Sequence, residues 1–218
     1  MGATIGEILP LAVGVAISPI PIIAVILMLL SRNAGATSAG FALGWVVGIL
    51  TVTAVVLTVA GSASADNSAA PYVGGVKVVL GILLIYLAIR QWRSRADTSP
   101  PKWMQAIDEF TFIKAIGLGL ALSAANPKNL LLCISAGVAI GGAELTTGGH
   151  LVALLVFVAL AACSVLVPVL GYALAADRMA GALDATKAWL QANNHIVMAT
   201  VLLILGVTVL GKGLGAVP

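Results

Sequence analysis

A lysine beside a proline lies inside an apolar stretch of this chain. Residues 121–132 read ALSAANPKNLLL, which places Asn126, Pro127, Lys128 and Asn129 in a row. Proline lacks the backbone N–H and clashes with the preceding turn, so it kinks or breaks a helix. A cation at the centre of a bilayer costs about 2.5–3.5 kcal/mol on insertion scales and usually marks function. The stretch therefore predicts a polar binding site at a break in a membrane helix.

A second break is expected near the N-terminus, at Ser18, Pro19 and Pro21. A shift of 108 positions along the sequence places Ser18 on Asn126 and Pro19 on Pro127. Backbone groups that a break frees within hydrocarbon need partners in the protein or in a wet cavity. We therefore expect the two breaks to form one site. Prolines that merely kink packed helices are the alternative.

The composition is that of an integral membrane protein. Of the 218 residues, 61% are hydrophobic and 9% charged, and the mean hydropathy is +1.12, whereas soluble domains are about 25% charged. A membrane-spanning helix needs about 20 apolar residues. Uncharged runs of that length or more occur at 8–31, 33–65, 145–176 and 188–211, and they do not alternate as the strands of a barrel would. The expected class is an all-α integral membrane protein.

Six transmembrane helices are expected, at about 6–30, 35–60, 72–92, 112–140, 147–175 and 195–213. They form a single membrane domain with two three-helix repeats, at about 6–92 and 112–213, joined by a loop at about 93–111. Because three is an odd number, the second repeat inserts upside down, as in many secondary transporters. The first and fourth helices are the ones broken at proline. An amphipathic insertion at 177–193 departs from the symmetry.

Two of the connections that carry basic residues contain an apolar stripe at helical spacing. Trp103, Ile107 and Phe110 form one stripe, and Leu183 and Leu190 belong to the other. Such segments are typical of short helices that lie in the headgroup region of a membrane.

Basic residues predict the orientation of the helices. One side carries Arg32, Arg90, Arg93, Arg95, Lys102, Lys114, Arg178 and Lys187. The opposite loops, 61–71 and 141–146, contain no Lys or Arg, and only Lys212 falls on that side. By the positive-inside rule the basic side is cytoplasmic and both termini are outside. The net charge of +3 is interpreted as this topology signal and not as nucleic-acid binding.

Lys128 has no expected acidic partner, because no Asp or Glu lies in the interior of a predicted span. Either backbone carbonyls with Asn126 or Asn129 hold the ammonium group, or it binds an anion of the substrate. Lys77 lies a few residues inside the third span, where it either lines the site or extends to the headgroups.

Several functions are disfavoured by what the spans lack. A cation exporter would use intramembrane carboxylates, and a proton relay would use an acid or a histidine. We expect His150 and His195 at the outer ends of the fifth and sixth helices. No nucleophile is paired with a base, so an enzyme is not expected. Cys133 and Cys163 form no CxxC pair and no ligand cluster, so neither a metal nor a cofactor is expected.

Gly40, Gly44 and Gly48 form a stripe of small residues on the second helix. Such a stripe lets another helix approach closely. The approaching helix is either another span of this chain or the same stripe in a homodimer.

Two motifs carry a family resemblance. SPIPIIAVILML at 18–29 and NPKNLLL at 126–132, with six spans and a basic central loop, resemble the lysine exporter (LysE) superfamily. Within it, the chain is similar to the glycolipid-addressing (GAP) and sulfolipid-addressing proteins of mycobacteria and their relatives. Ile20 stands where amino-acid exporters often have glycine, which favours the lipid branch. The substrate-binding residues that the resemblance implies are Ser18, Pro19, Pro21, Asn126, Pro127, Lys128 and Asn129.

The resemblance implies a transporter in the bacterial inner membrane that exports large cell-envelope lipids together with other envelope machinery. From the residues we add that the headgroup is anionic and that Lys128 is its countercharge. Alternating access would expose the headgroup to each leaflet in turn. A small-solute exporter of amino-acid type is one alternative. A scaffold subunit of a lipid-export complex, which itself transports nothing, is the other.

Overall fold

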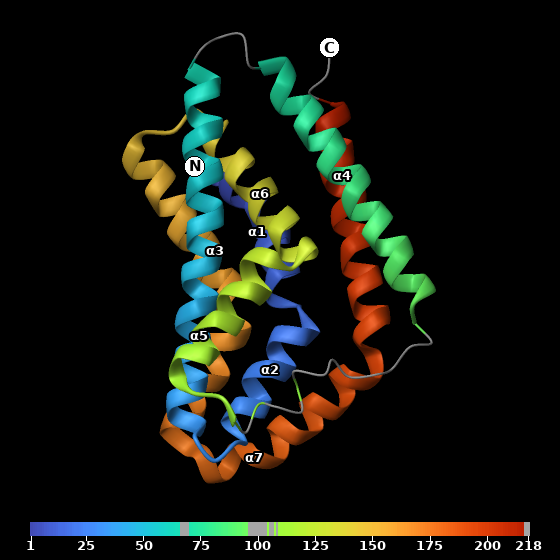
Figure 1. Cartoon of the computed structure of the whole chain (residues 1–218). Coiled ribbons are helices and arrows are strands. Elements are labelled where there is room, and N and C mark those ends of the chain that lie inside the picture. Colours follow the sequence, from blue (N-terminus) through green and yellow to red (C-terminus); the bar gives the residue numbers. More distant parts are fainter. Residues whose placement is uncertain (66–69, 96–103, 105–106, 108, 216–218) are drawn as a thin grey trace.

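The computed structural model describes residues 1–65, 70–95, 104, 107 and 109–215. These residues form helices and contain no strand (Figure 1). The elements are α1 (Gly2–Ala16), α2 (Pro19–Leu29), α3 (Ala34–Ala65), α4 (Ala70–Arg93), α5 (Phe112–Leu120), the π-helix η2 (Ala121–Ala125), α6 (Pro127–Gly141) and α7 (Thr147–Leu214).

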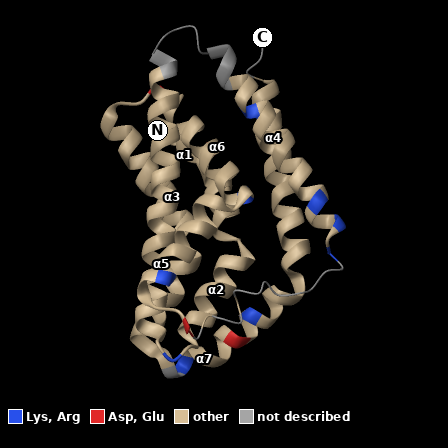
Figure 2. Ribbon diagram, viewed as in Figure 1, with Lys and Arg blue, Asp and Glu red and all other residues tan. Residues whose placement is uncertain are grey.

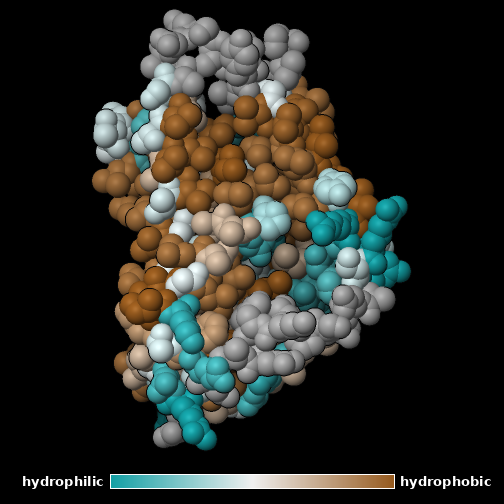
Figure 3. All heavy atoms as spheres, in the orientation of Figure 1, coloured by the Kyte–Doolittle hydropathy of each residue, from teal (hydrophilic) through white to brown (hydrophobic). Residues whose placement is uncertain are grey.

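The protein is a multi-pass α-helical membrane protein. Within the described residues, four segments are long and apolar enough to cross a bilayer: Ala34–Ser62, Gly74–Arg93, Thr147–Ala176 and Arg178–Leu214. The chain bends by 51° between α1 and α2, and the two helices add a fifth crossing if they cross as one bent span. α5 with η2, and α6, are apolar but each is shorter than a crossing. Apolar side chains dominate the upper half of the face in Figure 3.

The first helix break lies at the predicted prolines, between α1 and α2. Ser18 caps α2 in an extended conformation (φ −99°, ψ 106°), and Pro19 begins the helix. In a continuous helix the carbonyl of Ile17 would accept a hydrogen bond from residue 21. That residue is Pro21, which has no N–H to donate. The carbonyl of Ile17 therefore needs another donor.

The second break has the same local pattern. Asn126 is extended (φ −71°, ψ 117°), its Oδ1 accepts from the backbone N–H of Lys128 at 3.1 Å, and Pro127 begins α6. Before it, η2 follows the i→i+5 pattern of a π-helix. The next bond of that series would need an N–H on residue 127, which proline lacks. α5 begins at the lower end of Figure 1 and α6 finishes at the upper end.

The last helix also changes direction. Ala175 has non-helical angles (φ −154°, ψ 52°) within α7. The chain then runs across the lower end of the molecule and rises beside α4 (Figure 1). In the predicted insertion at 177–193, Leu183 and Leu190 are buried in the protein and Trp189 is exposed. Of the stripe in the central loop, Ile107 is buried, whereas Trp103 lies outside the described residues.

The glycine stripe of α3 packs within the chain. A Cβ at Gly44 would collide with the backbone of Ile116 on α5, and one at Gly40 would lie 2.6 Å from the Phe112 carbonyl oxygen. A Cβ at Gly48 would collide with Ser123 Oγ on η2. α5 and η2 therefore occupy the face of α3 that the sequence left open to either a helix of this chain or a second copy.

The two ends of the bundle differ in charge. We call the end where α1 begins and α7 finishes the terminal end, and the opposite end, where α4 finishes and α5 begins, the basic end. In Figure 2 most of the described Lys and Arg positions on the ribbon lie from the middle of the molecule downward, toward the basic end.

Candidate functional site

The two helix breaks meet in a network of hydrogen bonds. Lys128 Nζ donates to Ser18 Oγ at 2.9 Å and to the Ile17 carbonyl at 3.3 Å. Ser18 Oγ in turn donates to Asn129 Oδ1 at 2.9 Å, and Asn129 Nδ2 donates to the Leu122 carbonyl at 3.0 Å. We call Ile17, Ser18, Lys128 and Asn129 the polar node. It joins residues about 110 positions apart in the sequence.

The node supplies donors that the prolines removed. Lys128 donates to Ile17, the carbonyl that Pro21 leaves without an N–H partner. Asn129 donates to Leu122, the carbonyl that Pro127 leaves without a partner in the π-helical series. Each break is thus completed by polar side chains of α6. Freed backbone groups in an apolar environment are costly unless such partners exist.

Lys128 is a buried lysine whose partners among the described residues are all uncharged. It is 2% exposed, and none of its contacts among the described residues is an ion pair. An ammonium group has three donors, of which Ser18 and Ile17 accept two. Lys128 also lines a cavity. The arrangement leaves a hydrogen-bond donor of Lys128 beside this cavity.

An open cleft of about 530 Å³ adjoins the node on the side of the basic end. This cleft lies between the broken helices and the helices α4 and α7, and its described lining contains no Asp or Glu. We call it the polar cleft after Lys128, Arg90, Gln91, Ser94 and Asn126, which lie among apolar residues in its lining. Its volume is in the range of ligand-binding pockets, about 300–1,000 Å³. The lining residues are Ile20, Leu87, Arg90, Gln91, Ser94, Ala121, Leu122, Ala125, Asn126, Pro127, Lys128, His195, Met198 and Leu202.

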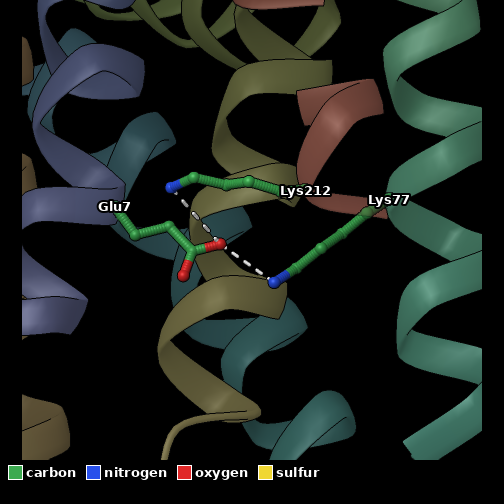
Figure 4. A network of polar contacts seen from close by, with 3 residues as sticks. All are labelled: Glu7, Lys77 and Lys212. Atoms are coloured by element: carbon green, nitrogen blue, oxygen red, sulfur yellow. Dashed lines mark hydrogen bonds and ion pairs between the residues drawn. The ribbon is translucent and has the colours of Figure 1, made fainter. Parts of the chain in front are cut away.

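The predicted site residues fall into two groups. Asn126, Pro127 and Lys128 line the cleft, while Ser18, Pro19, Pro21 and Asn129 are buried, with Ser18 and Asn129 in the node beneath it. Lys77 lies elsewhere: its Nζ is 2.9 Å from Glu7 Oε1, near Lys212 (Figure 4). Lys77 is therefore not among the residues that line the cleft with Lys128.

Sequence reasoning missed the wall of the cleft that α4 and α7 provide. Arg90 was interpreted only as a topology signal, and Gln91 was not singled out. Gln91 Nε2 lies 2.6 Å from His195 Nδ1, so His195 is at the basic end. The prediction placed His195 at the end of its helix away from the basic connections, whereas the structure places it at the basic end, because the segment before it runs along that end (Figure 1). The spacing of His195, Met198 and Leu202 on one helical face was the available signal.

We expect Ser18→Ala to lower the stability of the protein by about 1–3 kcal/mol, because Asn129 Oδ1 and one Lys128 donor would lose a buried partner. The measurement is the midpoint of thermal unfolding in detergent. Ser62→Ala is the matched control, since Ser62 donates to the Thr58 carbonyl at an exposed position and its loss should change stability by about 0.5 kcal/mol or less. Equal unfolding midpoints for the two variants would contradict a stabilising role for the hydrogen bonds of Ser18 in the polar node.

The protein is thus a multi-pass membrane protein in which two broken helices meet at a buried lysine, beneath a cleft whose described lining contains no Asp or Glu. A family model described as "Sap, sulfolipid-1-addressing protein" matches residues 8–215. The chain therefore belongs to the sulfolipid-1-addressing protein family. No curated protein and no solved structure matches the chain.

Proposed function

We propose that the protein moves an amphipathic, anionic lipid or glycolipid of the cell envelope outward across the inner membrane. The polar cleft would hold the headgroup, and the lipid tails would remain in the bilayer. The observation that carries the proposal is Lys128, a buried lysine that lines the cleft and has no acidic partner among the described residues. Membership of the sulfolipid-1-addressing family supports a lipid as the cargo.

The lining of the cleft favours an anionic headgroup. Lys128 and Arg90 contribute cations, and Gln91, Ser94 and Asn126 contribute neutral hydrogen-bonding groups. Leu87, Met198, Leu202 and Ile20 supply apolar surface for the beginning of an acyl chain. Charge-assisted hydrogen bonds from these side chains would stabilise an anionic headgroup in the cleft.

The mechanism rests on six crossings arranged as two inverted repeats. α1–α2 and α5–η2–α6 would each cross once as a broken helix, and α7 would cross twice, on either side of Ala175. The equivalent extended residues, Ser18 and Asn126, each followed by a proline, support the repeat. With the basic end in the cytoplasm, both termini lie outside and the cleft opens inward. Alternating access by rocking of the repeats would then expose the site to each leaflet.

The alternatives make different demands on this region. A scaffold subunit would need no cavity at the helix breaks, and the polar cleft argues against that role. A small-solute exporter of amino-acid type would use the same cations but would need no apolar surface beside them.

Leaflet exchange in liposomes tests the proposal. The purified protein is reconstituted with fluorophore-labelled anionic or zwitterionic lipid, and an impermeant quencher reports the label in the outer leaflet. We expect the anionic lipid to exchange faster with the protein than in protein-free vesicles. With the protein, the zwitterionic lipid should exchange more slowly than the anionic one. Absence of exchange by folded protein, together with uptake of a labelled amino acid, would favour the small-solute exporter.

Arg90→Gln is expected to slow anionic exchange by up to about fivefold, because a partly solvated ion pair contributes roughly 0.2–1 kcal/mol. Arg32→Gln is the matched control: Arg32 is exposed and does not line the cleft. The ratio of the two exchange rates is the measurement. If both variants slow exchange equally, the effect of Arg90 is one of general surface charge.

A further inference from the structure

A second group of charged residues lies away from the polar cleft. Glu7 on α1 is between Lys77 on α4 and Lys212 on α7, and Figure 4 shows the three side chains extending toward one another. Glu7 Oε1 is 2.9 Å from Lys77 Nζ and 3.9 Å from Lys212 Nζ. The side chains of Lys77 and Glu7 are only 17% and 26% exposed. We call these residues the ion cluster.

The ion cluster links two parts of the molecule. α4 packs mainly along α7, and the contact is close: a Cβ at Gly81 would lie 2.6 Å from the backbone N of Leu210, and one at Gly213 would lie 2.6 Å from that of Val78. We call α4 with residues 195–214 the arm. Such interlocked backbones favour movement of the arm as a unit. In Figure 1 the arm stands beside the remaining helices.

The space between the arm and the broken helices differs in volume between the two ends of the molecule. Toward the basic end they enclose the polar cleft of about 530 Å³. Toward the terminal end, the space beside Glu7, Lys77, Lys212, Leu205 and Ser135 is only about 20 Å³, which is room for about one water. Among the described residues, the space between the arm and the broken helices is therefore wide beside the node at the basic end and narrow beside the ion cluster at the terminal end.

We propose that the ion cluster is the gate that closes the terminal end of the transport path. Glu7 joins α1 to both helices of the arm, so its two ion pairs must break before the arm can separate from α1 there. The structure is then the state that is open at the basic end. This inference rests on the alternating access of the proposed function, to which it adds the residues that bias the two states.

Reciprocal labelling of two cysteine reporters tests the gate. Ser135→Cys reports the terminal end, because Ser135 is 4% exposed and lines the small space there. Ala125→Cys reports the polar cleft, which Ala125 lines. Each is placed in a Cys163→Ser background, where Cys133 remains buried. The rate of reaction with a water-soluble maleimide is measured in lipid nanodiscs, where both ends face water, and the background without a reporter gives the baseline.

Adding Glu7→Gln removes both ion pairs and leaves two lysines facing each other. We expect the Ser135→Cys reporter to react about tenfold faster and the Ala125→Cys reporter to react more slowly. Lys77→Gln should have a larger effect than Lys212→Gln, because its ion pair is shorter. An unchanged rate at Ser135→Cys would overturn the proposal, and faster reaction of both reporters would indicate general loosening and overturn it as well.

The outcomes separate the gate from the proposed function. Reciprocal labelling without lipid exchange in liposomes would keep the gate and reject a lipid as the cargo. Lipid exchange without reciprocal labelling would keep the transporter and reject the ion cluster as its gate.

Discussion

Replacement of Lys128 by methionine is expected to slow the exchange of anionic lipid at least about tenfold. The variant keeps an unbranched side chain of similar length but removes the cation and its donors at the base of the polar cleft. A hydrogen bond to a charged group contributes about 1.5–3 kcal/mol, and about 1.4 kcal/mol corresponds to a factor of ten. The measurement is leaflet exchange in liposomes, with anionic and zwitterionic lipids compared for each protein.

The stability of Lys128→Met distinguishes a binding role from a structural one. The variant loses the donors to Ile17 and Ser18, at roughly 1–3 kcal/mol for each acceptor left unsatisfied. It also removes a buried ammonium group that has no acidic partner among the described residues, and desolvation of such a group costs several kcal/mol. We therefore expect an unfolding midpoint close to that of the unmodified protein. Normal exchange by the folded variant would contradict the proposed role of Lys128, whereas loss of folding would assign it a structural one.

Gly44→Ala is expected to destabilise the protein by about 3 kcal/mol or more. A Cβ at this position would collide with the carbonyl group and Cα of Ile116, which are backbone atoms of α5. Overpacking costs typically about 1–3 kcal/mol, and here no flexible side chain can move aside. The thermal unfolding midpoint in detergent is the measurement.

Gly35→Ala is the matched control for Gly44→Ala. Gly35 lies in the same helix, and a Cβ there would meet nothing within 4 Å. Because alanine favours a helix over glycine by about 1 kcal/mol, Gly35→Ala should be neutral or slightly stabilising. A monomer of normal stability for Gly44→Ala would show that the contact between α3 and α5 is not needed for the fold. A concurrent loss of a dimer would instead assign the stripe to a second copy.

Much of the architecture could be predicted from the sequence, because its signals are local. Uncharged apolar runs predicted where the helices lie, and the prolines at 19 and 127 predicted both breaks. These effects depend on a missing N–H and on the length of an apolar segment, which neighbouring residues in the chain determine. The sequence also indicated the sulfolipid-addressing family, which the family match confirms.

The meeting of the two breaks depended on tertiary packing. Local sequence could not say that Ser18 would bridge Lys128 and Asn129, because that contact joins residues about 110 positions apart. The same holds for Lys77, whose partner Glu7 is 70 positions away. From the sequence, Lys77 could be either a site residue or a lysine that extends to the headgroups. The structure pairs it with the carboxylate of Glu7.

Composition and proline positions thus determined that this chain is a membrane protein with broken helices, since both follow from local chemistry. The tertiary structure decided which side chains replace the lost backbone donors. It also decided that α4 and α7 complete the polar cleft, and that α5 covers the glycine stripe of α3. Those outcomes depend on which helices lie side by side, because a hydrogen bond or a close backbone contact requires atoms within a few ångströms of one another.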